Sequence, residues 1–197
     1  MEKNCLVVLT FGVVICLLLG VGGCEIPSAK YERTVQLSAP LSAGYSFKAE
    51  THNGSITVEG RDEDGCDVTA VITGRASSVE TAKDIADRTK VRLKNSGNKI
   101  TVEIKKPMLG MYESVSVRLD VKLPKKTNIL LLGTHNGDVT VSDIKGKVDS
   151  STHNGSIKTE LPITLIGKVS KRKLQGKIGE GLGKLQLVTH NGSIKIR

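Results

Sequence analysis

The stretch that decides the fold is THNGSI, from Thr51 to Ile56, because the chain contains it in four versions. The others are THNGDV at residues 134–139, THNGSI at residues 152–157 and THNGSI at residues 189–194. Successive copies therefore begin 83, 18 and 37 residues apart, and together they hold all four histidines. The last interval is about twice 18 and contains a degenerate copy, KLQGKI, at residues 173–178. The sequence therefore predicts a structural unit of 18 residues that is used repeatedly.

Each unit is predicted to be a strand, a tight turn and a second strand. Gly137, Gly146 and Gly155 are nine residues apart, which leaves room for a strand of about five or six residues and a turn. Asn-Gly favours the left-handed backbone of such turns, so Asn154 and Gly155 are expected at positive φ. Buried and exposed positions should alternate on both sides of the first turn, at Phe47, Ala49, Ile56 and Val58.

Two all-β architectures fit this unit. In an antiparallel meander or sandwich, each Asn-Gly would be the turn of a β-hairpin. In a β-solenoid, each copy would stack on the previous one and the turns would line one edge. Recurrence of a whole hexapeptide favours stacking, because stacking places like residues against each other. We therefore expect solenoid-like repeats at residues 51–60, 134–142, 152–159 and 189–197.

The middle of the chain differs and predicts a small α+β insertion. A helix is expected at about residues 77–88, with Ser77 and Glu80 spaced as a capping box. Its apolar stripe would contain Val79, Ala82, Ile85 and Ala86. Alternating strands follow, of which the clearest spans residues 115–123 before Pro124. This insertion would close the end of the repetitive core.

The N-terminus has the form of an export signal. One lysine precedes an almost wholly apolar run at residues 6–19, and the small residues Gly22 and Gly23 precede Cys24. Residues 21–24 (VGGC) resemble the bacterial lipobox, which implies cleavage after residue 23 and lipid attachment at Cys24. Residues 24–45 would then form a tether and a first strand. The alternative is an uncleaved transmembrane helix at residues 5–23, which is long enough to span a bilayer.

Three runs of the repetitive part, at residues 50–60, 133–146 and 176–196, resemble the bacterial putative adhesin family, whose function is unknown. The resemblance covers residues 46–197. It implies a right-handed β-solenoid behind a signal peptide or membrane anchor, and it brings no catalytic residue.

The repeated histidines are the first candidates for chemistry. Stacked strands lie about 4.8 Å apart, so His135 and His153 would approach each other, and two imidazoles can bind a metal ion. No third ligand recurs at a fixed offset, since Asp138 occurs in one copy only. We expect no metal site and no cofactor, because structural metal sites use four ligands.

Catalysis is not expected either. Ser55, Ser156 and Ser193 each follow a histidine by three residues, but a nucleophile repeated in three of the four copies is better interpreted as a turn residue. Besides the lipid-attached Cys24, the mature domain would be left with only Cys66, which excludes a disulfide framework. No small-molecule substrate is indicated.

The charge favours anionic partners. The formal net charge is +9, and the densest basic run is KVSKRK at residues 168–173. This run would either contact an anionic envelope polymer or form a solvated surface. Nucleic-acid binding is not expected, because aromatic side chains for base stacking are not interleaved with it.

The sequence therefore predicts a non-enzymatic lipoprotein of the bacterial cell envelope, exported and anchored to a membrane by its lipid. Its rigid β-repeats would present a face for adhesion or binding at the cell surface or in the periplasm. The alternatives are an envelope-stress sensor or regulator that acts through another envelope protein and, more remotely, a histidine-dependent metalloenzyme. The sequence does not separate adhesion from regulation.

Overall fold

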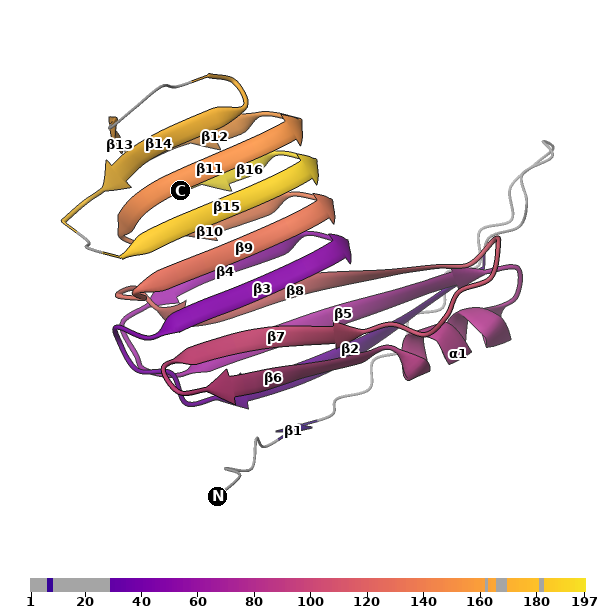
Figure 1. Ribbon diagram of the computed structural model, residues 1–197. Helices are drawn as coiled ribbons and strands as arrows, with labels where there is room; N and C mark the ends of the chain where they lie inside the picture. Colours follow the sequence, from indigo (N-terminus) through magenta and orange to yellow (C-terminus); the bar gives the residue numbers. More distant parts are fainter. Residues whose placement is uncertain (1–6, 9–28, 162, 166–169, 181–182) are drawn as a thin grey trace.

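The computed structural model describes residues 7–8, 29–161, 163–165, 170–180 and 183–197. The predicted lipid-attachment residue Cys24 lies outside these ranges, as does the predicted signal peptide apart from β1 (Val7–Val8). The described residues are mainly β-structure with one helix, arranged as two facing sheets (Figure 1).

Each sheet has eight strands. The first sheet has the order β1, β2 (Ala29–Ala39), β5 (Cys66–Ala76), β8 (Ser114–Pro124), β4 (Ile56–Arg61), β10 (Val139–Ser142), β16 (Ile194–Ile196) and β12 (Ile157–Thr159). The second sheet has the order β13 (Ile163–Leu165), β14 (Lys173–Ile178), β11 (Gly146–Asn154), β15 (Lys184–Asn191), β9 (Ile129–Asn136), β3 (Ser46–Asn53), β7 (Lys99–Lys105) and β6 (Lys90–Ser96).

The four hexapeptide copies lie side by side and form what we call the turn stack: residues 51–56, 134–139, 189–194 and 152–157, in spatial order. In each copy the strand of the second sheet ends at the asparagine, and the chain crosses at the glycine to a strand of the first sheet. The strands pair in parallel and in register, so Asn136 lies between Asn53 and Asn191, and Asn154 lies beyond Asn191.

The stack corrects the expected architecture. The all-β class with one helix is confirmed, but a solenoid is not supported, because the fourth copy lies between the second and the third. Both sheets are mixed, since β2, β5 and β8 pair antiparallel, and so do β11 and β14. Nor are the Asn-Gly turns β-hairpins, because each joins strands of different sheets. Identical repeats fix which residues face each other, but identity alone does not fix the order in which the copies stack.

The core lies between the two sheets and follows the predicted alternation. Phe47 and Ala49 of β3 and Ile56 and Val58 of β4 are fully buried, whereas their sequence neighbours face outward. Burial of such aliphatic side chains stabilises the fold by about 25 cal/mol per Å² of apolar surface.

The helix α1 (Val79–Arg88) covers one end of the antiparallel strands. Its N-cap is Ser78, whose Oγ accepts a hydrogen bond of 3.1 Å from the Thr81 backbone N–H. The predicted capping box of Ser77 and Glu80 is therefore wrong by one residue. Of the predicted apolar stripe, Ala82, Ile85 and Ala86 are buried and Val79 is exposed. The helix begins at Val79, two residues later than its sequence pattern indicates, and Val79 in its first turn is exposed.

Candidate binding face of the turn stack

The glycines of the turn stack let neighbouring backbones touch. A Cβ atom at Gly155 would overlap the carbonyl oxygen of Gly192, and one at Gly192 would overlap that of Gly137. The expectation that Asn154 and Gly155 occupy positive-φ positions is wrong: among the described non-glycine residues, Asp143 is the one with positive φ, and Gly155 is outside that region. Close packing between turns, and not hairpin geometry, is what requires glycine at residue 155.

The threonine that begins each copy lies next to the turn of a neighbouring copy, and the threonine hydroxyls link the turns by hydrogen bonds. They point inward and are buried. Thr134 Oγ1 donates a hydrogen bond of 2.9 Å to the carbonyl of Gly54, and Thr189 Oγ1 donates one of 2.9 Å to that of Gly137. A buried hydroxyl needs a hydrogen-bond partner, and the carbonyl of the neighbouring turn supplies it. The same hydrogen bond links the two turns.

The asparagines form a ladder of side-chain amides. Asn136 donates from Nδ2 to Asn53 Oδ1 at 2.8 Å, and Asn191 donates to Asn136 at 2.7 Å. Asn154 continues the ladder by donating to Asn191 at 2.7 Å. Every amide therefore uses its neighbour in the next strand, which fixes the register of the stack at its edge.

The four histidines are stacked outside this edge. Their ring centroids are 4.7 Å apart between His52 and His135, 4.6 Å between His135 and His190, and 4.6 Å between His190 and His153. The planes of neighbouring rings differ by 3–5°. All four rings are exposed, and we call this row the histidine ladder.

The ladder lowers the basicity of two of its members. Partial desolvation, followed by the charges of His135 and His153, lowers the pKa of His190. Partial desolvation also lowers the pKa of His52, with smaller contributions from Lys106 and His135. A protonated neighbour repels a second positive charge, so His52 and His190 take up protons less readily than isolated histidines.

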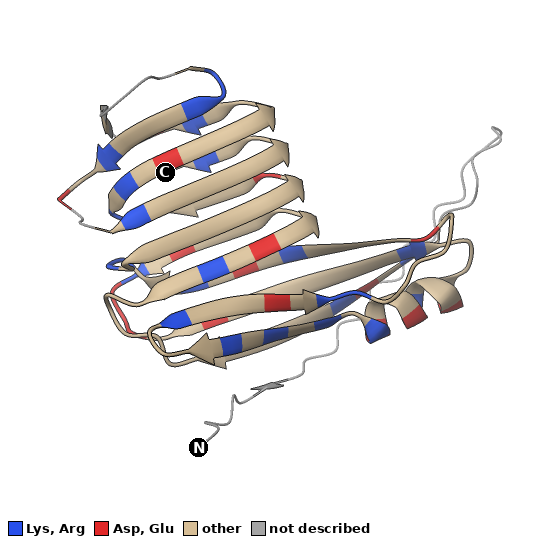
Figure 2. Ribbon diagram, in the orientation of Figure 1, with Lys and Arg blue, Asp and Glu red and all other residues tan. Residues whose placement is uncertain are grey.

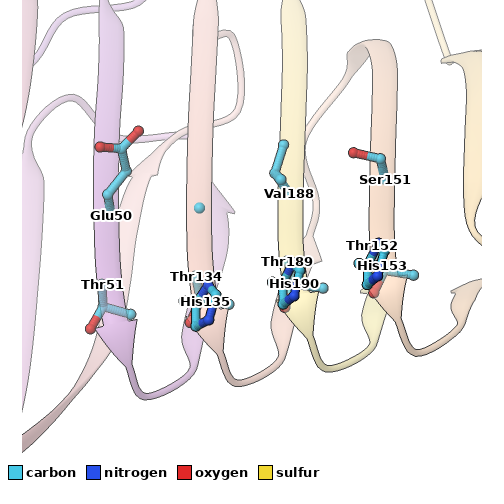
Figure 3. Close-up of a pocket in the computed structure, with 11 residues that line it drawn as sticks. Glu50, Thr51, Thr134, His135, Ser151, Thr152, His153, Val188, Thr189 and His190 are labelled. Carbon is cyan, nitrogen blue, oxygen red and sulfur yellow. The ribbon is translucent and has the colours of Figure 1, made fainter.

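A shallow open groove runs beside the histidine ladder, across β3, β9, β15 and β11. Glu50, Gly133, Val188 and Ser151 are paired in register along it, and Figure 3 shows Glu50 and Ser151 on its two outer strands. Gly133 has no side chain, so its position leaves the groove unfilled where β9 crosses it. Glu50 also forms an ion pair with Lys48, with Nζ and Oε1 3.0 Å apart.

A row of lysines crosses the other end of the same face. Lys177 on β14, Lys147 on β11 and Lys184 on β15 are paired in register, so their positions are about 4.8 Å apart. Figure 2 shows the three basic bands in line. Lys177 is near Glu180, with 3.8 Å between Nζ and Oε2. Like charges directly opposite each other destabilise a sheet, so this lysine row favours an anionic neighbour.

Ser55 and Asp138, which follow the histidines of their copies by three residues, form hydrogen bonds between neighbouring turns. Ser55 Oγ accepts a hydrogen bond of 3.3 Å from the backbone of Asp138, and the Asp138 carboxylate accepts one of 2.7 Å from the backbone of Ser193. Cys66 is fully buried in the core. Of the basic run at residues 168–173, residues 168 and 169 lie outside the described part, and Lys171, Arg172 and Lys173 are exposed.

Within the described ranges, no group of three or more His, Cys, Asp or Glu side chains could hold a metal ion. The stacking of the histidines also disfavours metal binding between them. Parallel rings place their nitrogens side by side, so the nitrogens do not converge on one point. The approach of His135 and His153 expected from the sequence does not occur directly, because His190 lies between them.

Sequence reasoning missed the lysine row and the groove. Lys147 and Lys184 are 37 residues apart and become neighbours only because the fourth copy is inserted beside the third. The available signal was that each lies five residues before the threonine of its own copy, which places both at the same register position.

No protein-family model matches the sequence, and no curated protein matches it. The chain is similar in structure to a putative cell adhesion protein of Clostridium sporogenes, with 10% sequence identity, a TM-score of 0.41 and coverage of 83% of this chain and 99% of that one. It is also similar to a putative adhesin of Parabacteroides distasonis (9% identity, TM-score 0.33, 83% of this chain and 56% of that one). A third is a putative adhesin of Bacteroides fragilis (9% identity, TM-score 0.31, 84% of this chain and 97% of that one).

These similarities concern the course of the chain and carry no information about what this protein binds. In the part of the chain that the structure describes, no helix combines the length and apolar character needed to cross a membrane.

Proposed function

We propose that this protein is a non-enzymatic lipoprotein of the bacterial cell envelope, anchored through Cys24, whose turn stack binds an extended anionic envelope polymer. The binding face is the outer surface of β3, β9, β15 and β11, between the histidine ladder and the lysine row. The observation that carries the proposal is the register, because the pairing of four strands places four identical histidines in one continuous row beside an open groove.

A regular row suits a polymer better than a small molecule. Small-molecule sites are concave and enclose most of their ligand, whereas this groove is shallow and open. From Lys184 to His190 the face measures about 20 Å, at about 3.3 Å per residue of strand. A chain lying across the strands would meet an equivalent side chain about every 4.8 Å.

Charge gives the class of polymer. The net charge of +9 attracts polyanions, and the lysine row concentrates part of it on the proposed face. Protonation of His52 and His190, whose pKa values are lowered, adds positive charge at low pH, so binding should strengthen as the pH falls.

Polymer binding is tested with polyglycerol phosphate as the probe and neutral dextran as the control ligand. The double variant Lys147→Gln/Lys184→Gln should bind polyglycerol phosphate about tenfold more weakly, which corresponds to a loss of about 1.4 kcal/mol. The matched control, Lys83→Gln/Lys158→Gln, removes two exposed lysines elsewhere and keeps the same net charge. Equal weakening in both double variants would leave only nonspecific attraction and contradict the proposed face.

Lipid anchoring is tested separately. The protein should incorporate radiolabelled palmitate, and Cys24→Ser should abolish the label and release the protein into the soluble fraction. If the wild-type protein retains Met1 and carries no label, the lipid anchor is wrong and an uncleaved transmembrane segment is the anchor instead.

A further inference from the structure

Most of the exposed apolar side chains gather at one end of the molecule. Among the described residues, five large apolar side chains are exposed: Val79 (59%), Met108 (94%), Met111 (89%), Tyr112 (69%) and Val188 (40%). Val188 lies in the groove of the turn stack, and Met108, Met111 and Tyr112 lie in the loop between β7 and β8. Val79 is the first residue of α1, three residues after β5 ends at Ala76.

This end is also where the chain enters the fold. Ala29, the first residue of β2, is paired with Ala76, and Arg75 is paired with Ser114, the first residue of β8. The loop that ends at Ser114 is therefore two strands from the start of β2, or about 10 Å. Figure 1 shows the loop and α1 at the same end of the long strands β2, β5 and β8.

A short connection ties this end to the proposed anchor. Cys24 precedes Ala29 by five residues, and five residues span at most about 18 Å when fully extended. If Cys24 carries lipid chains in a bilayer, as proposed above, Ala29 lies within that distance of the bilayer surface. The exposed loop, about 10 Å from Ala29, is then close enough to reach the same surface.

The loop has the composition of a membrane-interface segment. Tyrosine is enriched at membrane interfaces, where its ring is apolar and its hydroxyl remains hydrated, and methionine contributes flexible apolar surface. A turn fixes the loop, since Glu113 N–H donates to the Gly110 carbonyl at 3.2 Å and Gly110 N–H donates to Glu113 Oε2 at 2.8 Å. Lys105 is exposed next to the loop and can reach lipid phosphates.

We propose that residues 108–112, together with Val79, insert into the interface of the phospholipid bilayer in which Cys24 is anchored. The protein then touches the membrane at two points, the lipid chains and this loop. Two points of contact fix the orientation of the domain relative to the bilayer.

Tryptophan fluorescence tests the insertion, because the chain contains no tryptophan of its own. The full lipidated Tyr112→Trp protein is reconstituted in vesicles of phosphatidylcholine and phosphatidylglycerol, with and without brominated phosphatidylcholine. The emission of its single tryptophan should move to shorter wavelength and be quenched by more than about twofold, as expected for a ring at the interface. The matched control is Lys126→Trp, an exposed position beyond the far end of β8, whose emission should be neither shifted nor quenched.

A second variant separates insertion from mere proximity. Adding Met108→Ser and Met111→Ser to the Tyr112→Trp protein should restore the water-exposed emission. Both methionines are exposed, so the circular dichroism spectrum should not change.

The outcomes distinguish this inference from lipid anchoring. If the Tyr112→Trp protein is palmitoylated and sediments with vesicles, but is quenched no more than the Lys126→Trp protein, loop insertion is overturned and the anchor stands. A protein that carries no label and does not sediment with vesicles overturns both. Quenching of the Tyr112→Trp protein that persists when Cys24→Ser is added supports insertion independently of the lipid.

Discussion

Leu187→Ala tests the most unexpected feature of the fold, the position of β15, the last strand of the second sheet along the chain, between β9 and β11. Leu187 on β15 is 0% exposed, and β15 pairs with β9 on one side and β11 on the other. Truncating a fully buried leucine costs about 2–5 kcal/mol, depending on how far the cavity collapses. Because β11 pairs with β15 and β14, loosening β15 should also detach β11 and β14 from the rest of the sheet.

Hydrogen–deuterium exchange, measured peptide by peptide, is the assay. In the wild type, residues 184–191 should exchange more slowly than residues 173–178, although they are nearer the C-terminus. In Leu187→Ala, protection should fall together over β15, β11 and β14, while β5 and β8 keep theirs. The matched control is Leu174→Ala on β14, where the side chain is 6% exposed. It should loosen β13 and β14 and leave β15 and β9 protected.

Two results would refute this reasoning. One is a wild type in which residues 184–197 exchange faster than residues 146–154, as expected if the copies stacked in sequence order. The other is a Leu187→Ala protein in which β15 loses protection but β11 and β14 do not.

Three further predictions concern local features. Gly155→Val should lower the free energy of unfolding by about 1–3 kcal/mol, because the added Cβ would overlap the Gly192 carbonyl. His153→Ala should change it by no more than about 0.5 kcal/mol, because His153 is exposed. Denaturant unfolding compares the two proteins, and a larger loss for His153→Ala would contradict the close packing assigned to Gly155. The pKa of His190 is lowered in the folded protein, so the unfolded chain takes up the proton first: stability is complete above about pH 6.5 and falls as the pH decreases below it. Thermal melts should show a smaller decrease in Tm from about pH 7.5 to about pH 5.5 for His190→Gln than for the wild type, and an identical decrease would exclude this contribution. Ser78→Ala removes the N-cap acceptor of α1 and should cost about 1 kcal/mol, while Ser77→Ala should cost less; the reverse ranking in urea melts would restore Ser77 as the cap.

Several features follow from the sequence alone. The alternation around Phe47 and Ile56 predicted which residues are buried, because strand periodicity alternates the two faces whatever the topology. Recurrence of THNG predicted that the turns meet in register, since matched asparagines can then bond to each other. His52, His135, His153 and His190 occupy the same position of the four copies, and this equivalence also predicted a ladder of turn residues.

Other features depended on tertiary structure. The stacking order placed His190 between His135 and His153, and Lys147 beside Lys184, because near-identical copies offer equal pairing to either neighbour and only the connections between them decide. Asn-Gly indicated a positive φ at Gly54, Gly137 and Gly192, where the structure has one, but not the different φ of Gly155 in the same motif.

The sequence by itself therefore determined the strands, their inward faces and the equivalence of the four turns, all of which depend on residues close together in the chain. Tertiary structure alone decided the order of the copies, the lysine row and the groove. It also decided that Met108, Met111 and Tyr112 lie at the end where β2 begins. These depend on contacts between distant segments, whose energies arise from the packing of two whole sheets and are not encoded in any local pattern.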